Sequence, residues 1–274
     1  MRRERARPAG HREAARRDAA RRDAARGAVR TGRAWARAAL PGPLGALPEF
    51  LIIGAQRCGT TSLYHYLSAH PDVRAATGKE LQYFSLHHRR GLRWYRAHFP
   101  VRPPHVRAFE ASPYYLFDPD VPARAAAALP QARFVALVRD PVERAYSHYL
   151  HARARGFEPL SFADALDAEP DRMRRGLRRE FSYVARGRYA EQLRRWHAHV
   201  GAERVLVVRT QELTADYGRI LDFLGLRRHT PDDFARHTRR REVDGPSQLT
   251  PALRERLAAE FAADQAELAG LIGG

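Results

Sequence analysis

The chain has 274 residues, of which 44% are hydrophobic and 29% charged, and its formal net charge is +17. This length allows one large domain or two small ones with a sizeable core, and the composition excludes a collagen-like fibre and a wholly disordered chain. No apolar run approaches the roughly 20 residues that span a bilayer, which excludes a protein with several membrane-spanning helices.

Cysteine usage and the amino-terminal segment bear on the compartment. Cys58 is the only cysteine, which excludes an intramolecular disulfide and a zinc site built from cysteine pairs. Residues 38–48 follow a basic segment as in a signal peptide, but they contain three prolines and form no continuous apolar core. We therefore expect no signal peptide and a cytoplasmic location.

Residues 1–48 differ from the rest of the chain. They contain thirteen arginines and four acidic residues, a net charge of +9, which leaves 17 − 9 = +8 for the remainder. The repeat AARRDAARRDAAR at 14–26 has no apolar stripe, so we expect a disordered or frayed helical tail. The alternative is an electrostatic tether to nucleic acid or to the surface of an anionic membrane.

From residue 49 the hydrophobic pattern alternates between strands and helices. Residues 50–55 (FLIIGA) and 132–138 (ARFVALV) are apolar runs typical of buried parallel strands. The expected elements, in chain order, are strand 50–55, helix 61–69, helix 91–99, strand 106–111, helix 121–129, strand 132–138, helix 141–154, helix 188–200, strand 204–209, helix 216–224 and helix 251–271. This order predicts an α/β fold, a three-layer α/β/α arrangement with a mostly parallel sheet.

The segment 54–62, GAQRCGTTS, joins the first strand to the first helix. Its spacing is that of a phosphate-binding P-loop, and a helix start offers free N–H groups and the positive end of the helix dipole to an anion. Thr60 stands where a nucleoside triphosphatase has its lysine, and the cation comes earlier, as Arg57. The pattern predicts a site for a phosphate-like anion with no metal; an ordinary strand–helix turn is the alternative.

A second motif, VRDPVERAYS, occupies 138–147. Arg139 ends a strand, and Ser147 lies about two helical turns later on the same side of the junction. A guanidinium and a hydroxyl in this arrangement suit a second phosphate. Asp140 precedes a proline and is a candidate helix cap, and we expect Arg144 to form a surface ion pair.

With both motifs in place, the sequence resembles the sulfotransferases that use 3′-phosphoadenylyl sulfate (PAPS), in particular the heparan sulfate glucosaminyl N- and 3-O-sulfotransferases. The resemblance extends from about residue 50 to 271. The matching segments are AQRCGTTSL at 55–63, HPDV at 70–73, KELQYF at 79–84, GLRWYRAHFP at 91–100, EASPYYL at 110–116, LVRDPVERAYSHY at 137–149, GRYAEQLRRW at 187–196 and DFLGL at 222–226. It implies a P-loop NTPase-like fold and a sulfotransferase domain over 49–274.

The resemblance also implies a donor site. The loop would bind the 5′-phosphosulfate, with Arg57 in place of the family's lysine, while Arg139 and Ser147 would bind the 3′-phosphate. Tyr189 would line the cleft, or else be a core tyrosine. The residues expected at the donor are Arg57, Cys58, Gly59, Thr60, Thr61, Ser62, Arg139, Ser147, Tyr189, Arg240 and Arg241. Beyond this contact, Cys58 is expected to be simply a small loop residue; a thiol pKa lowered by the nearby helix start is the alternative.

Three residues are candidates for catalysis beside Arg57. Glu80 occupies the position of the family's catalytic base, although a surface glutamate is the alternative. Lys79 is the only lysine in the chain. This indicates that the site needs a compact ammonium group; the alternative is that a single lysine is there by chance. His151 follows Ser147 by four residues, the spacing of a catalytic histidine in the N-sulfotransferases; a packing role is the alternative.

The sequence therefore predicts an enzyme that moves a sulfuryl group from PAPS to a hydroxyl or amine of a carbohydrate, lipid or secondary metabolite. The positive charge would suit an anionic acceptor. Three departures from the family are EASP at 110–113, where relatives often have EKTP, the missing carboxyl-terminal disulfide loop, and the lack of a clean K-G-R run, for which Arg239–Arg241 is the nearest candidate. The alternatives are a P-loop nucleotide kinase and a basic nucleic-acid-binding protein; we do not expect nucleic acid as a partner, because no nucleic-acid module is recognised.

Overall fold

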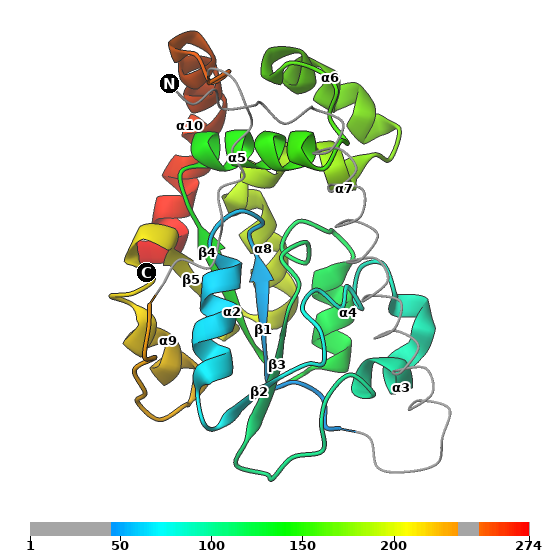
Figure 1. The fold of residues 1–274 in the computed structure, drawn as a ribbon, viewed down its shortest axis with the longest axis vertical. Helices are drawn as coiled ribbons and strands as arrows, with labels where there is room; N and C mark the ends of the chain where they lie inside the picture. Colours follow the sequence, from blue (N-terminus) through cyan, green and yellow to red (C-terminus); the bar gives the residue numbers. More distant parts are fainter. Residues whose placement is uncertain (1–44, 235–246, 274) are drawn as a thin grey trace, which may run out of the picture.

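The computed structural model describes residues 45–234 and 247–273 (Figure 1). Five strands form one sheet in the order β2-β3-β1-β4-β5, and every neighbouring pair is parallel. The strands are β1 (Phe50–Gly54), β2 (Val73–Ala75), β3 (Arg107–Ala111), β4 (Arg133–Val138) and β5 (Val205–Arg209). The predicted α/β fold with a parallel sheet is confirmed.

Helices cover both faces of the sheet, and Figure 1 shows α2 on one face and α8 on the other. Further helices, including α5 and α6, lie beyond the carboxyl end of β1. The helices are α2 (Thr60–Ala69), α3 (Gly91–Arg96), α4 (Val121–Ala128), α5 (Pro141–Ala154), α6 (Phe162–Arg174), α7 (Arg178–Phe181), α8 (Tyr189–Val200), α9 (Tyr217–Leu224) and α10 (Pro251–Gly273).

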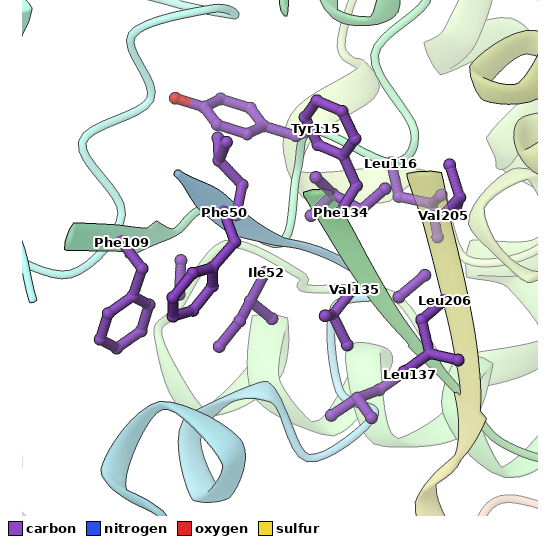
Figure 2. Close-up of a cluster of buried hydrophobic side chains, with 14 of the residues drawn as sticks. Phe50, Ile52, Phe109, Tyr115, Leu116, Phe134, Val135, Leu137, Val205 and Leu206 are labelled. Carbon is purple, nitrogen blue, oxygen red and sulfur yellow. The ribbon is translucent and has the colours of Figure 1, made fainter. Parts of the chain in front are cut away.

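The core lies between the sheet and its helices. All five residues of β1 are buried, because helices cover both faces of the sheet. An apolar sequence suits such a strand, since it has no polar side chains that would lose contact with water. Phe50 stacks on Phe109 of the neighbouring β3 with ring centroids 5.1 Å apart (Figure 2). On the other face, Phe134 contacts Trp196 of α8 at 4.9 Å. Each such buried side chain contributes about 1.5–3 kcal/mol to folding.

The helix after β4 confirms the sequence prediction at both ends. Pro141 occupies its first turn, and the Asp140 carboxylate caps the helix by accepting a hydrogen bond from the Glu143 N–H at 2.8 Å. The predicted strands and helices agree with the structure within a few residues elsewhere, with α3 ending at Arg96 rather than at 99.

Besides the three-residue strand β2, the sequence analysis missed the two α-helices between 155 and 187. The longer is α6, which begins after the capping residue Ser161 and buries Phe162, Ala165 and Leu166. It contains Pro170 and many charged residues, and both features hide its helical period. The other is α7, a helix of four residues, too short to show a period.

Two expectations can be compared with only part of the chain: the basic tail and the lack of membrane-spanning segments. The predicted tail, 1–48, lies outside the described residues except for its last four positions. Among the helices that are described, none combines the length and apolar character needed to cross a membrane.

The strand β3 carries a carboxyl group into the core. Glu110 is fully buried, and the loss of solvation raises its pKa to about 8, an effect that the nearby hydroxyls of Tyr115 and Tyr95 offset only in part. In the unfolded chain this group ionises near its ordinary value of 4.5. Between these two values the unfolded state releases a proton that the folded state retains, so Glu110 makes the protein less stable as the pH rises through this window.

We therefore expect Glu110→Gln to reduce the loss of stability between about pH 5 and about pH 8, because the amide cannot ionise. The free energy of unfolding, measured by urea denaturation at both pH values, should favour the variant increasingly as the pH rises. Glu255→Gln, at an exposed position, is the matched control and should follow the wild type. Parallel profiles for Glu110→Gln and the wild type would contradict the buried, protonated carboxyl.

Candidate active site

A cavity of about 460 Å³ lies at the carboxyl end of β1. It collects residues from five separate parts of the chain. The lining residues are Gln56, Arg57, Gly59, Thr60, Thr61, Lys79, Glu80, Gln82, Pro113, Tyr114, His148, His151, Ala152, Arg155, Phe157, Arg179, Glu180 and Arg186. The structure thus brings the loop, the 79–82 segment and α5 together around one cavity.

The segment 55–62, which we call the donor loop, turns from β1 into α2. Gly59 has φ of +87°, a conformation that glycine adopts without steric cost, and its carbonyl accepts hydrogen bonds from the N–H groups of Ser62 (2.9 Å) and Leu63 (3.2 Å). The helix therefore starts immediately after Gly59. The N–H groups of Thr60 and Thr61 come before these first helical hydrogen bonds, and together with the helix dipole they favour an anion beside the cavity.

Arg57 connects the two predicted phosphate motifs. Its backbone has φ of +72°, and its Nε donates a hydrogen bond to the Ser147 hydroxyl at 3.1 Å. Arg139 donates from Nη1 to the Arg57 carbonyl oxygen at 3.3 Å, and its Nη2 lies 3.7 Å from the Glu143 carboxylate. Arg139 therefore holds the backbone of the donor loop from the end of β4.

The side chains of Lys79 and Glu80 lie beside the first turn of α2. The Lys79 ammonium donates a hydrogen bond to the Thr61 hydroxyl at 2.6 Å and lies 3.9 Å from the Glu80 carboxylate. Burial lowers the pKa of Lys79. Glu80 is exposed, has φ of +61°, and its N–H donates to the Ala111 carbonyl at 2.9 Å, which anchors it to the end of β3. A carboxylate in this position has access to a molecule in the cavity.

Two histidines of α5 line the cavity, and the sequence analysis named only His151. His148 is 2% exposed, and burial, followed by the nearby charges of Arg186 and Arg144, lowers its pKa well below 6.5. It is therefore neutral near pH 7. The available signal was the spacing of three residues, which places both histidines on one face of a helix.

Cys58 of the donor loop contacts Tyr189, and neither residue is among those that line the cavity. Both are fully buried, and the Cys58 sulfur lies 3.5 Å from the Tyr189 hydroxyl. Burial raises the pKa of the Cys58 thiol and outweighs the lowering by the Tyr189 hydrogen bond, so the alternative of a lowered pKa is wrong. Thr210, which sequence reasoning missed, donates to the Cys58 carbonyl at 2.7 Å and ties the loop to the end of β5.

Arg144 differs from its prediction as a surface ion pair. It is fully buried and donates a hydrogen bond to the Tyr183 carbonyl oxygen. The error arose because the packing of residues 181–184 over α5 was not foreseen. Arg240 and Arg241, predicted at the donor, lie outside the described residues.

The lining of the cavity carries an excess of positive charge. Its carboxylates are Glu80 and Glu180, while its cations are Arg57, Lys79, Arg155, Arg179 and Arg186. Such a lining attracts anions into the cavity. Within residues 45–234 and 247–273, no three histidine, cysteine or acidic residues are grouped as a metal site would need.

Comparisons with known proteins agree with this arrangement. Residues 47–250 match the model of the sulfotransferase domain family. Human bifunctional heparan sulfate N-deacetylase/N-sulfotransferase 3 is 33% identical over 200 residues, covering 67% of this chain and 23% of that protein. Human heparan sulfate glucosamine 3-O-sulfotransferase 3B1 is 33% identical over 195 residues, covering 68% of this chain and 48% of that protein.

A solved structure is also similar. The crystal structure of a sulfotransferase from Alicyclobacillus acidocaldarius is 33% identical, with a TM-score of 0.71, and the match covers 83% of this chain and 96% of that one. The chain spans less than half the length of either curated relative. The family match covers most of the chain, including the donor loop and the residues that surround it, and the chain belongs to the sulfotransferase domain family.

Proposed function

We propose that this protein transfers the sulfuryl group of PAPS to a hydroxyl or amine of an acceptor. The observation that supports this most directly is the meeting of three groups at the start of α2. The donor loop offers its amides there, Arg57 turns back to Ser147, and Lys79 bridges Thr61 and the Glu80 carboxylate. Sulfuryl transfer requires three elements: an anion site for the donor, a cation beside the leaving group and a base for the acceptor.

The donor loop would hold the 5′-phosphosulfate through the N–H groups of α2 and the hydroxyls of Thr60, Thr61 and Ser62. Arg57 would offset the negative charge that develops on the departing phosphate oxygen. A guanidinium stays protonated near neutral pH, so Arg57 acts by charge and hydrogen bonding and not by giving up a proton. Arg139 and Ser147 would bind the 3′-phosphate, and Arg240 and Arg241 remain candidates for the same nucleotide.

Glu80 would accept the proton of the acceptor hydroxyl or amine. The acceptor oxygen or nitrogen then forms a bond to sulfur as the bond between sulfur and the phosphate oxygen breaks, and adenosine 3′,5′-bisphosphate leaves with the bonding electrons. Lys79 would orient Glu80 and stabilise the charge on the transferring group. His151 would assist from α5, on the helix that also carries Ser147.

The acceptor would be a small molecule or glycan, such as a carbohydrate, lipid or secondary metabolite. The two curated relatives are named for heparan sulfate, and the positive lining of the cavity suits an acidic acceptor. The family match does not favour either alternative considered from the sequence, a nucleotide kinase or a nucleic-acid-binding protein. We also propose that the catalytic domain spans 49–274, and that the basic tail makes any peripheral membrane contact.

The function is tested by transfer of labelled sulfate from PAPS to a panel of amino sugars, hydroxylated lipids and phenols. We expect transfer to at least one acceptor class, with adenosine 3′,5′-bisphosphate as the second product. Phosphate transfer from ATP without any sulfate transfer would contradict the proposal.

Glu80→Gln should lower kcat by about 10²–10⁴-fold, because an amide cannot accept the acceptor proton. The matched control is Glu180→Gln, which removes the other carboxylate of the cavity lining and should leave kcat within about threefold of the wild type. Steady-state kinetics with labelled PAPS measure both. Equal effects of the two substitutions would refute the assignment of the base.

Arg57→Ala should lower kcat by about 10²–10³-fold, because the leaving group loses a positioned charge. Arg57→Lys restores a cation of the kind that the resemblance places in this loop, and should recover most of that loss. The same kinetic measurement applies, with the melting temperature as a check on folding. Activity in Arg57→Ala close to that of the wild type would exclude a role at the leaving group.

A further inference from the structure

Arg186 contacts two parts of the cavity lining at once. It lies in a short helical turn, Ala185–Gly187, and is 3% exposed. Its Nη1 donates a hydrogen bond to the side-chain oxygen of Gln56 in the donor loop. Its Nη2 donates to the carbonyl oxygens of Arg178 (3.3 Å) and Arg179 in α7. One guanidinium therefore joins the donor loop to α7.

The chemistry of these contacts favours a geometric role. The acceptors are all neutral oxygens, and the guanidinium carbon also lies 4.8 and 5.2 Å from the ring centroids of Tyr114 and Phe117. Burial lowers the pKa of Arg186 to about 10, so the group remains a cation near pH 7. A planar fork fixes the directions of its hydrogen bonds, which a lysine ammonium does not. The side chain therefore sets the position of the two segments relative to each other.

Both segments that Arg186 joins face the cavity. Gln56 directly precedes Arg57 in the donor loop, and Arg179 and Glu180 of α7 are also part of the lining. The helix α7 has four residues and none of them is buried. Phe181 packs against a core cluster and lies under the Arg172 guanidinium at 4.2 Å, while Arg178 and Arg179 are exposed and their carbonyl groups are tied to the donor loop through Arg186.

We propose that Arg186 is a positioning residue that couples the donor loop to α7, so that nucleotide bound at the loop also orders this part of the acceptor cavity. A phosphate on the loop amides restricts the loop and with it the Gln56 side chain. The hydrogen bond to Arg186 then carries the restriction to the carbonyl groups of α7. This inference rests on the proposed function, because it takes the donor nucleotide as the ligand of the loop.

The coupling is measurable by amide hydrogen exchange with and without adenosine 3′,5′-bisphosphate. In the wild type, the nucleotide should slow exchange by about fivefold or more both in residues 55–62 and in residues 178–184. Arg186→Lys keeps the charge and loses the fork. In this variant the nucleotide should still protect the loop, while protection of 178–184 falls to the nucleotide-free rate.

Two further variants separate positioning from a general loss of stability. Arg194→Lys changes a well-exposed arginine of α8 that pairs with Glu267 at 3.0 Å, and it should behave as the wild type. Gln56→Ala removes the same hydrogen bond from the loop side and leaves Arg186 in place. It should abolish the protection of 178–184 by nucleotide, as Arg186→Lys does. This variant therefore tests the coupling if Arg186→Lys folds poorly. A merely structural Arg186 would predict faster exchange in both nucleotide-free and bound states, with the nucleotide effect on α7 retained.

The outcomes also separate this inference from the proposed function. Nucleotide binding to the wild type with protection confined to 55–62 would overturn the coupling alone. Persistent protection of 178–184 in both Arg186→Lys and Gln56→Ala would do the same. A wild type that binds no adenosine 3′,5′-bisphosphate would defeat the proposed function as well.

Discussion

The turn from β1 into α2 sets the geometry on which the rest of the site depends. Gly59 allows the chain to reverse at positive φ, and the helix begins at the next residue. The N–H groups of the first turn then lie beside the cavity with the positive end of the helix dipole. Arg57 and Lys79 add side-chain charge at the same place. An anion bound there would offset the repulsion between the positive charges of Arg57 and Lys79, which the fold places close together.

The surrounding elements hold this turn through contacts from several parts of the chain. Arg139 holds its backbone from the end of β4, Thr210 holds it from β5, and Tyr189 contacts its Cys58. Arg57 and Ser147 join it to α5. These contacts come from residues far apart in the sequence, and they meet at one end of the sheet because all the strands run parallel. A parallel sheet thus concentrates these contacts at a single edge.

The side of the cavity that we propose for the acceptor is organised differently from the donor loop. Glu80 is the exposed carboxylate at the mouth of the cavity, while His148 is neutral because burial and neighbouring cations exclude its charged form. Exposed residues such as Arg155, Phe157 and Arg179 complete the lining. Because these residues come from connections and from the short helix α7, they can differ between relatives without changing the donor site.

The donor loop, β1, β4 and the start of α5 could be predicted from the sequence because their signals are local. Apolar runs, glycine at a turn and proline after a capping aspartate each act over a few residues. The burial of Arg144 and the placement of His148 and Arg186 could not, because they depend on how residues 155–187 pack against α5 and the donor loop. With 47 arginines in the chain, no single arginine stands out by composition.

The most direct test is isothermal titration calorimetry of the wild type with adenosine 3′,5′-bisphosphate in a buffer that contains a metal chelator. The account predicts saturable binding at one site per chain. Backbone amides and hydroxyls supply hydrogen bonds to the nucleotide, and guanidinium groups supply the positive charge that offsets its phosphates. No binding of this nucleotide, together with binding of ATP that requires magnesium, would contradict it.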